Sequence, residues 1–185
     1  MRSEALALLE QQSRQGHLDL LYGDESRVSP EGYVPYGWQF EEEEVCIESA
    51  KGKGLNCFAL LSRDNRIRYA TSQESITAEF ILEQLDRLSL EVAKPTVVVL
   101  DNARVHTAAK VKKQLGVWQQ RGLFLFYLPA YSPHLNIAER LWKELKARWL
   151  KPQDYLTTDS LFYAVKMALA AVGKSLFINF SDFKI

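Results

Sequence analysis

The sequence predicts an α/β fold, a mixed five-stranded sheet with helices on both faces. In the first half, apolar segments of strand length are separated by short turn sequences, a pattern typical of antiparallel hairpins. After Lys94-Pro95, strand and helix patterns alternate, which is typical of parallel strands joined by helices. The 185 residues are enough for one domain with a substantial core.

In the first half, an Ala- and Leu-rich helix is expected over residues 4–14, and a buried strand, LDLLYGD, over 18–24. Three segments are candidates for antiparallel strands: VCIES (45–49), LNCFALLS (55–62) and IRYATS (67–72). The junctions KGKG and RDN between them have the composition of hairpin turns.

In the second half, Thr77 is expected to cap a helix that carries apolar residues at helical spacing. The strand TVVVLD is a continuous β-branched run, typical of a strand covered on both faces. The remaining predicted elements are a helix over 106–115, a strand over 123–128, a helix over 137–150 and a last helix from Thr158.

This order of elements is the ribonuclease H-like arrangement, also found in retroviral integrases, and as a fold analogy it implies no activity by itself. In that topology the first and fourth strands lie side by side, and the helix over 137–150 packs across their ends. Asp24, Asp101 and Glu139 are therefore expected to meet. Three oxygen ligands without a His or Cys partner suit Mg²⁺ or Mn²⁺, the ions that assist phosphoryl transfer.

Each of these acids also has a structural interpretation. Asp24 could belong to a turn, and its neighbour Glu25 could take its place at the site, although strand alternation sends adjacent side chains to opposite faces. Asp101 could cap the following helix, a role open to Asn102 as well. Glu139 could reach back to Asn136 in a capping box.

His106 follows Asp101 by five positions, and either orients a phosphate or water or is a structural histidine. The loop before Glu139 contains two prolines and Tyr131. Tyr131 and Trp38 are candidate stacking surfaces for bases, with packing as the alternative role.

The formal net charge is zero, but the charge is distributed unevenly. Residues 1–100 hold 10 Lys and Arg against 17 Asp and Glu, whereas residues 101–151 hold 10 against 3. A segment with a balance of +7 around two candidate ligands suits a surface that binds phosphates, and a solvated helix face is the alternative. The candidate phosphate contacts are Arg104, Lys110, Lys112, Lys143 and Lys146.

No apolar run approaches the ~20 residues of a membrane helix, and the N-terminal residues do not have the pattern of a signal peptide. Cys46 and Cys57 have neither metal-binding spacing nor a convincing disulfide pattern. We therefore expect a reduced, cytoplasmic setting without a membrane partner.

The segments LYGDESRV, VVVLDNARVHTAAKV and YLPAYSPHLNIAERLWKELK resemble the three blocks of the IS630-type transposases, part of the Tc1/mariner group with a DDE catalytic domain. The resemblance runs from Leu18 to Lys151. It implies a bacterial, nucleoid-associated catalytic domain whose core is residues 18–151, followed by a C-terminal helix and tail over 152–185. It also implies that Asp24, Asp101 and Glu139 are the catalytic, metal-binding triad.

The implied chemistry uses two ions ~3.5–4 Å apart to cut DNA at element ends. The freed 3′-OH then attacks target DNA, for which the family suggests a TA dinucleotide. The resemblance further implies a homo-oligomer on DNA and helix-turn-helix modules that bind the element ends. Such modules do not precede the catalytic segment here, and three explanations are open: a product of a split reading frame whose partner chain supplies them, a truncated copy, or an excised domain.

The chain departs from the family pattern in three ways. Ile137-Ala138 stands where the family often has Pro-Ile, and His134 stands where it often has Asp. The 37 residues between Asp101 and Glu139 form a somewhat longer gap than the family leads us to expect. Two other functions remain open: a ribonuclease H-like nuclease without strand transfer, and a non-catalytic DNA-binding remnant of a truncated element.

Overall fold

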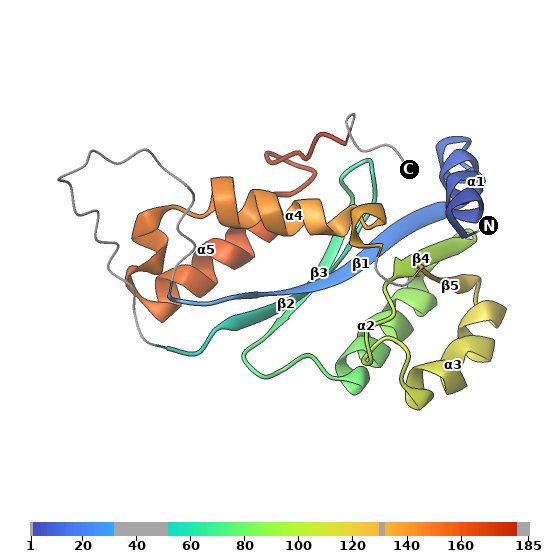
Figure 1. Cartoon of the computed structure of the whole chain (residues 1–185), viewed down its shortest axis with the longest axis horizontal. Helices are drawn as coiled ribbons and strands as arrows, with labels where there is room; N and C mark the ends of the chain where they lie inside the picture. The colour runs from blue at the N-terminus through green and yellow to red at the C-terminus, as the bar shows by residue number, and fades with distance from the viewer. Residues whose placement is uncertain (1, 32–51, 130–131, 181–185) are drawn as a thin grey trace.

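The computed structural model describes residues 2–31, 52–129 and 132–180. Five strands form one sheet in the order β3-β2-β1-β4-β5, with helices on both faces (Figure 1). The predicted mixed sheet of ribonuclease H-like type is confirmed.

The first three strands are antiparallel neighbours: β1 (Asp19–Val28), β2 (Leu55–Leu61) and β3 (Ile67–Ser72). The turn between β2 and β3 includes Asn65, which has a positive φ of 63°. This is the RDN turn that the sequence predicts. The strand expected over 45–49 lies outside the described residues.

The two parallel strands lie on the other side of β1. β4 (Thr96–Leu100) pairs in parallel with β1, and β5 (Leu123–Tyr127) pairs in parallel with β4. All five residues of β4 are buried, as its unbroken apolar run predicts. The first and fourth strands are therefore neighbours, and Asp101 follows the carboxyl end of β4.

Helices α2 (Ala78–Glu91) and α3 (Ala109–Gln120) cover one face of the sheet. The side chain of Thr77 caps α2, as predicted. α3 begins three residues later than the helix expected from His106, because residues 104–106 form a turn that returns His106 toward Asp101.

The opposite face is covered by α1 (Arg2–Arg14), α4 (Ala138–Glu144) and α5 (Thr158–Ala171), which share a second core. α4 continues into a π-helical turn, Leu145–Trp149, so the helix expected over 137–150 is present with a wider last turn. The stripe predicted for the last helix is buried and consists of Leu161, Val165, Ala168, Leu169 and Val172.

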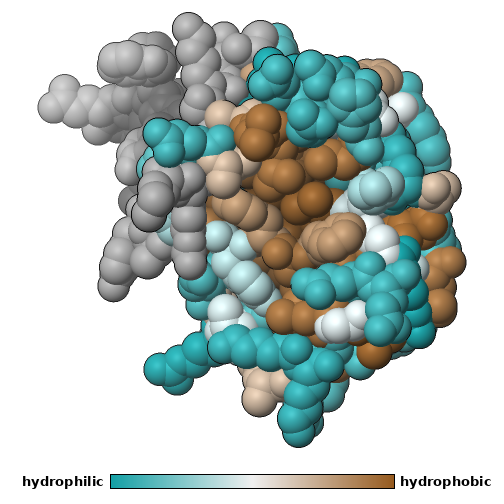
Figure 2. Space-filling model, turned by 90° about the vertical axis from the view of Figure 1, so that its right-hand side faces the viewer, coloured by the Kyte–Doolittle hydropathy of each residue, from teal (hydrophilic) through white to brown (hydrophobic). Residues whose placement is uncertain are grey.

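Figure 2 shows the end of the molecule at the right of Figure 1, which bears α1, β5 and α3. Hydrophobic side chains gather there in a hollowed band between hydrophilic rims. β5 is an outer strand of the sheet, and its Phe124 is 39% exposed. None of the helices in the described ranges is long and apolar enough to cross a membrane.

Candidate catalytic carboxylate site

Asp24 lies within β1 and not at its end, which corrects the expected strand boundary. β1 continues to Val28 because its antiparallel pairing with β2 continues, and Asp24 is paired with Ala59. Parallel pairing with β4 stops earlier, at Tyr22. Asp24 therefore stands on a rigid strand at the point where the partner strand β4 has ended.

Gly23 allows β1 to pass close to the last residue of β4. A Cβ at this position would lie 2.5 Å from Cδ2 of Leu100 and 3.0 Å from Cδ2 of Leu60. Leu100 and Leu60 are buried, with exposures of 0% and 2%, so they have little room to move. The glycine before Asp24 thus keeps the site close to the end of β4.

Asp101 follows β4 directly, and its side chain is 51% exposed. Its Oδ1 accepts hydrogen bonds from the backbone N–H of Ala103 at 2.9 Å and from Nδ1 of His106 at 2.7 Å. The hydrogen bond from His106 is the main reason that the pKa of Asp101 lies below its usual value.

The helix-capping alternative for Asp101 and Asn102 does not describe their contacts. The N-cap position of α3 is Ala108, whose side chain makes no capping bond. Asn102 instead donates from Nδ2 to the carbonyl of Leu128 at 2.5 Å, which joins the loop after β4 to the loop after β5.

Glu139 is exposed in the first turn of α4. Among the described residues, the carboxylate of Glu139 accepts no hydrogen bond from the backbone N–H of Asn136, so the capping box is not formed. The N-cap position of α4 is Ile137, and Oδ1 of the preceding Asn136 accepts from the N–H of Ala138 at 3.1 Å. The carboxylate of Glu139 therefore remains available to bind a cation at the N-terminal end of α4, the end that is joined to β1 through Asn136.

The three carboxylates are close enough to affect one another. Burial raises the pKa of Asp24 to about 7, and the charges of Glu25, Asp101 and Glu139 add to this increase. Negative charges that oppose ionisation in this way favour a bound cation. Within the described ranges, however, no three His, Cys, Asp or Glu side chains are already arranged to hold a metal ion.

The donor set fits Mg²⁺ or Mn²⁺, because all three candidate ligands are carboxylate oxygens, which these hard cations prefer. Nδ1 of His106 is hydrogen-bonded to Asp101, so the neighbouring imidazole does not add a nitrogen ligand.

Trp142 was not predicted from the sequence as a site residue. Its indole Nε1 donates to Oδ2 of Asp24 at 3.1 Å, and its ring is buried under α4. The only signal in the sequence is its position three residues after Glu139, one turn further along the same helix. α4 therefore supplies both Glu139 and a donor that orients Asp24.

Glu25 is a second residue whose contact was not predicted. Its Oε2 lies 3.0 Å from Nε2 of His106, an ion-pair distance, but the two atoms are not aligned as a hydrogen bond. Burial alone would lower the pKa of His106, but Asp101 and Glu25 outweigh burial and raise it to about 9. The two carboxylates therefore favour the protonated form of the imidazole.

Two of the predicted phosphate contacts lie on the α4 side of the site. Lys143 is exposed on α4, whereas Lys146 is partly buried in the π-helical turn. Burial lowers the pKa of Lys146, and the nearby Cys57 and Asp24 oppose this shift. Lys146 is therefore near the carboxylate of Asp24.

The other predicted phosphate contacts lie after β4. Arg104 is exposed in the turn that precedes α3, and Lys112 is exposed on α3 itself. Lys110 is ion-paired with Glu79 of α2, so it is already engaged by a carboxylate. Tyr131 and Trp38, the candidate stacking aromatics, lie outside the described residues.

Asn136 connects α4 to β1 at the site. Its Nδ2 donates to the carbonyl of Gly23 at 3.0 Å, and the residue is 3% exposed. We expect Asn136→Ala to lower the free energy of unfolding by about 2–3 kcal/mol, since it removes the acceptor of the Ala138 N–H at the start of α4 and leaves the buried carbonyl of Gly23 without its donor. Urea unfolding measures this loss. Asn56→Ala, which removes one exposed bond to Glu74, is the control and should cost below ~1 kcal/mol.

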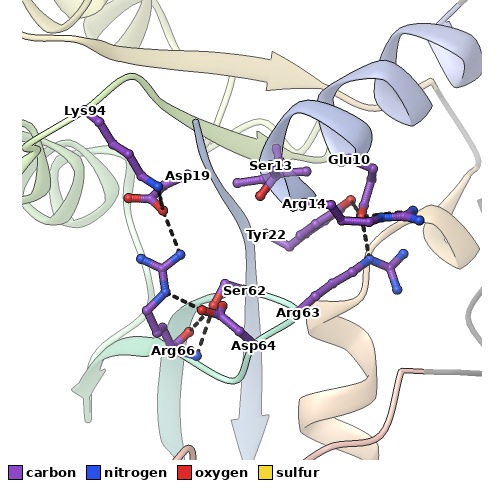
Figure 3. Close-up of a pocket in the computed structure, with 11 residues that line it drawn as sticks. Glu10, Ser13, Arg14, Asp19, Tyr22, Ser62, Arg63, Asp64, Arg66 and Lys94 are labelled. Atoms are coloured by element: carbon purple, nitrogen blue, oxygen red, sulfur yellow. Dashed lines mark hydrogen bonds and ion pairs between the residues drawn. The ribbon is translucent and has the colours of Figure 1, made fainter. Parts of the chain in front are cut away.

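A polar pocket of about 330 Å³ lies around the start of β1 (Figure 3). Its cations are paired with carboxylates: Arg63 with Glu10, Arg66 and Lys94 with Asp19. This pocket is therefore a network of internal ion pairs, and not a set of free cations that would bind phosphate.

The family model described as DDE superfamily endonuclease matches residues 19–161. No curated protein matches the sequence. The matched segment contains all three candidate carboxylates.

Several solved structures share the fold at low sequence identity. The pre-cleavage Mos1 transpososome is 16% identical with a TM-score of 0.54, and the match covers 95% of this chain and 62% of that chain. The catalytic core domain of BIV integrase is 14% identical with a TM-score of 0.53, and 86% of each chain is covered. The HTLV-2 integrase catalytic core domain in complex with magnesium is 13% identical with a TM-score of 0.54, and the match covers 90% of this chain and 91% of that chain. The chain thus spans about three fifths of the Mos1 chain and most of each integrase core.

Proposed function

Because this chain belongs to the DDE superfamily endonucleases, we propose that it is the catalytic domain of an IS630-type transposase of the Tc1/mariner group. It cuts DNA at transposon ends and joins the freed 3′-OH to target DNA. The observation that carries this proposal is the placement of three acids on adjoining elements: Asp24 on β1, Asp101 directly after the neighbouring β4, and Glu139 on α4, which Asn136 joins to β1.

Asp24, Asp101 and Glu139 would hold two Mg²⁺ or Mn²⁺ ions. When bound, such ions activate water, and later the 3′-OH, and stabilise the leaving oxygen of the phosphodiester. Mos1 paired-end complexes have been solved with Mg and with Mn, which supports the choice of ion. Trp142 and His106 orient Asp24 and Asp101 through the hydrogen bonds described above.

DNA binds across the basic segment. Lys143 and Lys146 contact phosphates next to the carboxylates, and Arg104 and Lys112 contact them on the other side. Lys110 joins them only by exchanging Glu79 for a phosphate. The proposal also includes a TA target, assembly of several copies on DNA, and recognition of the transposon ends by helix-turn-helix modules.

The test is cleavage of a DNA duplex that carries the ends of the element encoding this chain, with Mg²⁺ present. We expect Asp101→Asn to reduce cleavage by more than about 100-fold, since loss of a metal ligand should exceed the ~10–100-fold cost of losing an outer-shell partner. Asp159→Asn, an exposed carboxylate in the first turn of α5, is the matched control and should cleave normally.

The products distinguish the proposal from its alternatives. A transposase yields joined DNA, whereas a nuclease without strand transfer yields only hydrolysed ends. A non-catalytic remnant binds DNA equally well with and without Asp101→Asn and does not cut. Unchanged cleavage by Asp101→Asn would show that the assignment of the ligands is wrong.

A further inference from the structure

Glu25 and Asp24 are neighbours in β1 but lie on opposite faces of the sheet. Asp24 is on the α4 side, where Trp142 donates to it. Glu25 is paired in register with Phe58, which belongs to the core under α2 and α3. Glu25 is therefore separated from the α4 side of the site by the strand itself.

His106 reaches across from the end of β4 to meet Glu25. Its side chain is completely buried, and its ring lies against Phe58 with the ring centroids 6.4 Å apart. Its backbone N–H donates to the carbonyl of Ala103 at 3.0 Å, and its carbonyl accepts from the hydroxyl of Tyr127 at 2.9 Å. The two backbone hydrogen bonds and the contact with Phe58 thus fix the position of the imidazole.

The two ring nitrogens of His106 face two different carboxylates. Nδ1 lies 2.7 Å from Oδ1 of Asp101, and Nε2 lies 3.0 Å from Oε2 of Glu25. Across the described part of the chain, Nε2 has no hydrogen-bond partner, and its polar contact is the ion pair with Glu25. Glu25 is therefore the group that positions the Nε2 edge of the imidazole, opposite Asp101.

This arrangement distinguishes the two oxygens of Asp101. Oδ1 already accepts two hydrogen bonds, from Ala103 and from His106. Oδ2 has no hydrogen-bond partner among the residues that the structure describes, and the side chain is 51% exposed. Oδ2 is consequently the oxygen that remains available to a cation.

We propose that Glu25 and His106 form a positioning pair that holds Asp101 by Oδ1 and leaves Oδ2 to bind a divalent cation. Glu25 acts only through His106 and is not itself a ligand. This inference rests on the proposed function, because it assumes that Asp101 binds the ion. It assigns a role to the carboxylate that strand alternation directs away from the site.

The test is the affinity of the DNA-free protein for Mn²⁺, measured by electron paramagnetic resonance of the unbound ion. We expect Glu25→Gln to weaken Mn²⁺ binding by about 10-fold or more, the usual effect of losing an outer-shell partner. Glu83→Gln, an exposed carboxylate paired with Arg87 on α2, is the matched control and should bind Mn²⁺ as the unmodified protein does.

A double-mutant cycle separates positioning from direct ligation. His106→Gln offers no donor at the place of Nδ1, so Glu25 can no longer act on Asp101 through the ring. We expect Glu25→Gln to cause no further loss of Mn²⁺ affinity in the His106→Gln protein. A further loss of the same size as in the unmodified protein would make Glu25 an independent ligand and overturn the proposal.

The remaining outcomes are also decisive. Normal Mn²⁺ affinity in Glu25→Gln overturns the positioning pair, provided that Asp101→Asn weakens binding. If Asp101→Asn also binds Mn²⁺ normally, the proposed function itself is wrong. Should Glu25→Gln fail to fold, Glu25→Asp takes its place. The shorter side chain keeps the negative charge but moves it away from Nε2. Unchanged Mn²⁺ affinity in Glu25→Asp equally overturns the proposal.

Discussion

Asp24→Asn is expected to abolish Mg²⁺-dependent cleavage and, at the same time, to stabilise the metal-free protein at pH 8. The raised pKa of about 7 means that folding opposes the ionisation of Asp24. The full shift corresponds to at most about 4 kcal/mol, and partial exposure and solvent screening reduce this. We expect a gain of roughly 1–2 kcal/mol at pH 8, measured by urea unfolding in EDTA.

The pH dependence follows from the sign of this shift. An acid with a raised pKa in the folded state binds its proton more tightly there than in the unfolded chain, so it stabilises the fold at low pH. That contribution is lost as the pH rises from the ordinary value of 3.8 to about 7. The advantage of Asp24→Asn should therefore grow through this range and remain constant above it.

Asp86 provides a matched control, because its pKa is shifted in the opposite direction from that of Asp24. It accepts from the indole Nε1 of Trp118 at 3.1 Å, the same kind of bond at the same length as between Trp142 and Asp24. That hydrogen bond is the main reason that the pKa of Asp86 is lowered. Asp86→Asn should destabilise the protein at pH 8, and a loss of stability in Asp24→Asn as well would contradict our account of the site.

Glu10→Ala is expected to lower the free energy of unfolding by about 3–5 kcal/mol, the usual cost of removing one member of a buried ion pair. Glu10 is 2% exposed on α1, accepts a hydrogen bond from the hydroxyl of Tyr22 and lies 2.7 Å from Nε of Arg63 (Figure 3). Burial beside Glu10 strongly raises the pKa of Tyr22, so its hydroxyl keeps its proton and needs an acceptor.

Urea unfolding at pH 7 measures this effect. Gln11→Ala changes the adjacent, exposed residue of the same helix and should remain within about 0.5 kcal/mol of the unmodified protein. Glu10→Gln keeps one acceptor for Tyr22, so its free energy of unfolding should lie between those of Glu10→Ala and Gln11→Ala. Equal stability of Glu10→Ala and Gln11→Ala would show that this network does not hold α1 against the sheet.

Most of the fold could be predicted from local patterns. The apolar run of β4, the Thr77 cap of α2 and the apolar stripe of α5 are each contained in a short window of sequence. Boundaries were harder to predict where distant partners determine them. β1 runs past Asp24 because β2 pairs with it, and α3 begins after His106 because the preceding turn is held to Asp101.

Local sequence patterns were enough to identify the three acids and the element that carries each, because residue type and periodicity are local properties. The contacts around these acids could be found only from the arrangement of the elements in space. The indole of Trp142 contacts Asp24 because α4 packs on β1. The imidazole of His106 joins Glu25 to Asp101 because β1 and β4 are neighbours in the sheet. Such contacts depend on strand order and register, which link residues 118 positions apart in the case of Trp142 and Asp24.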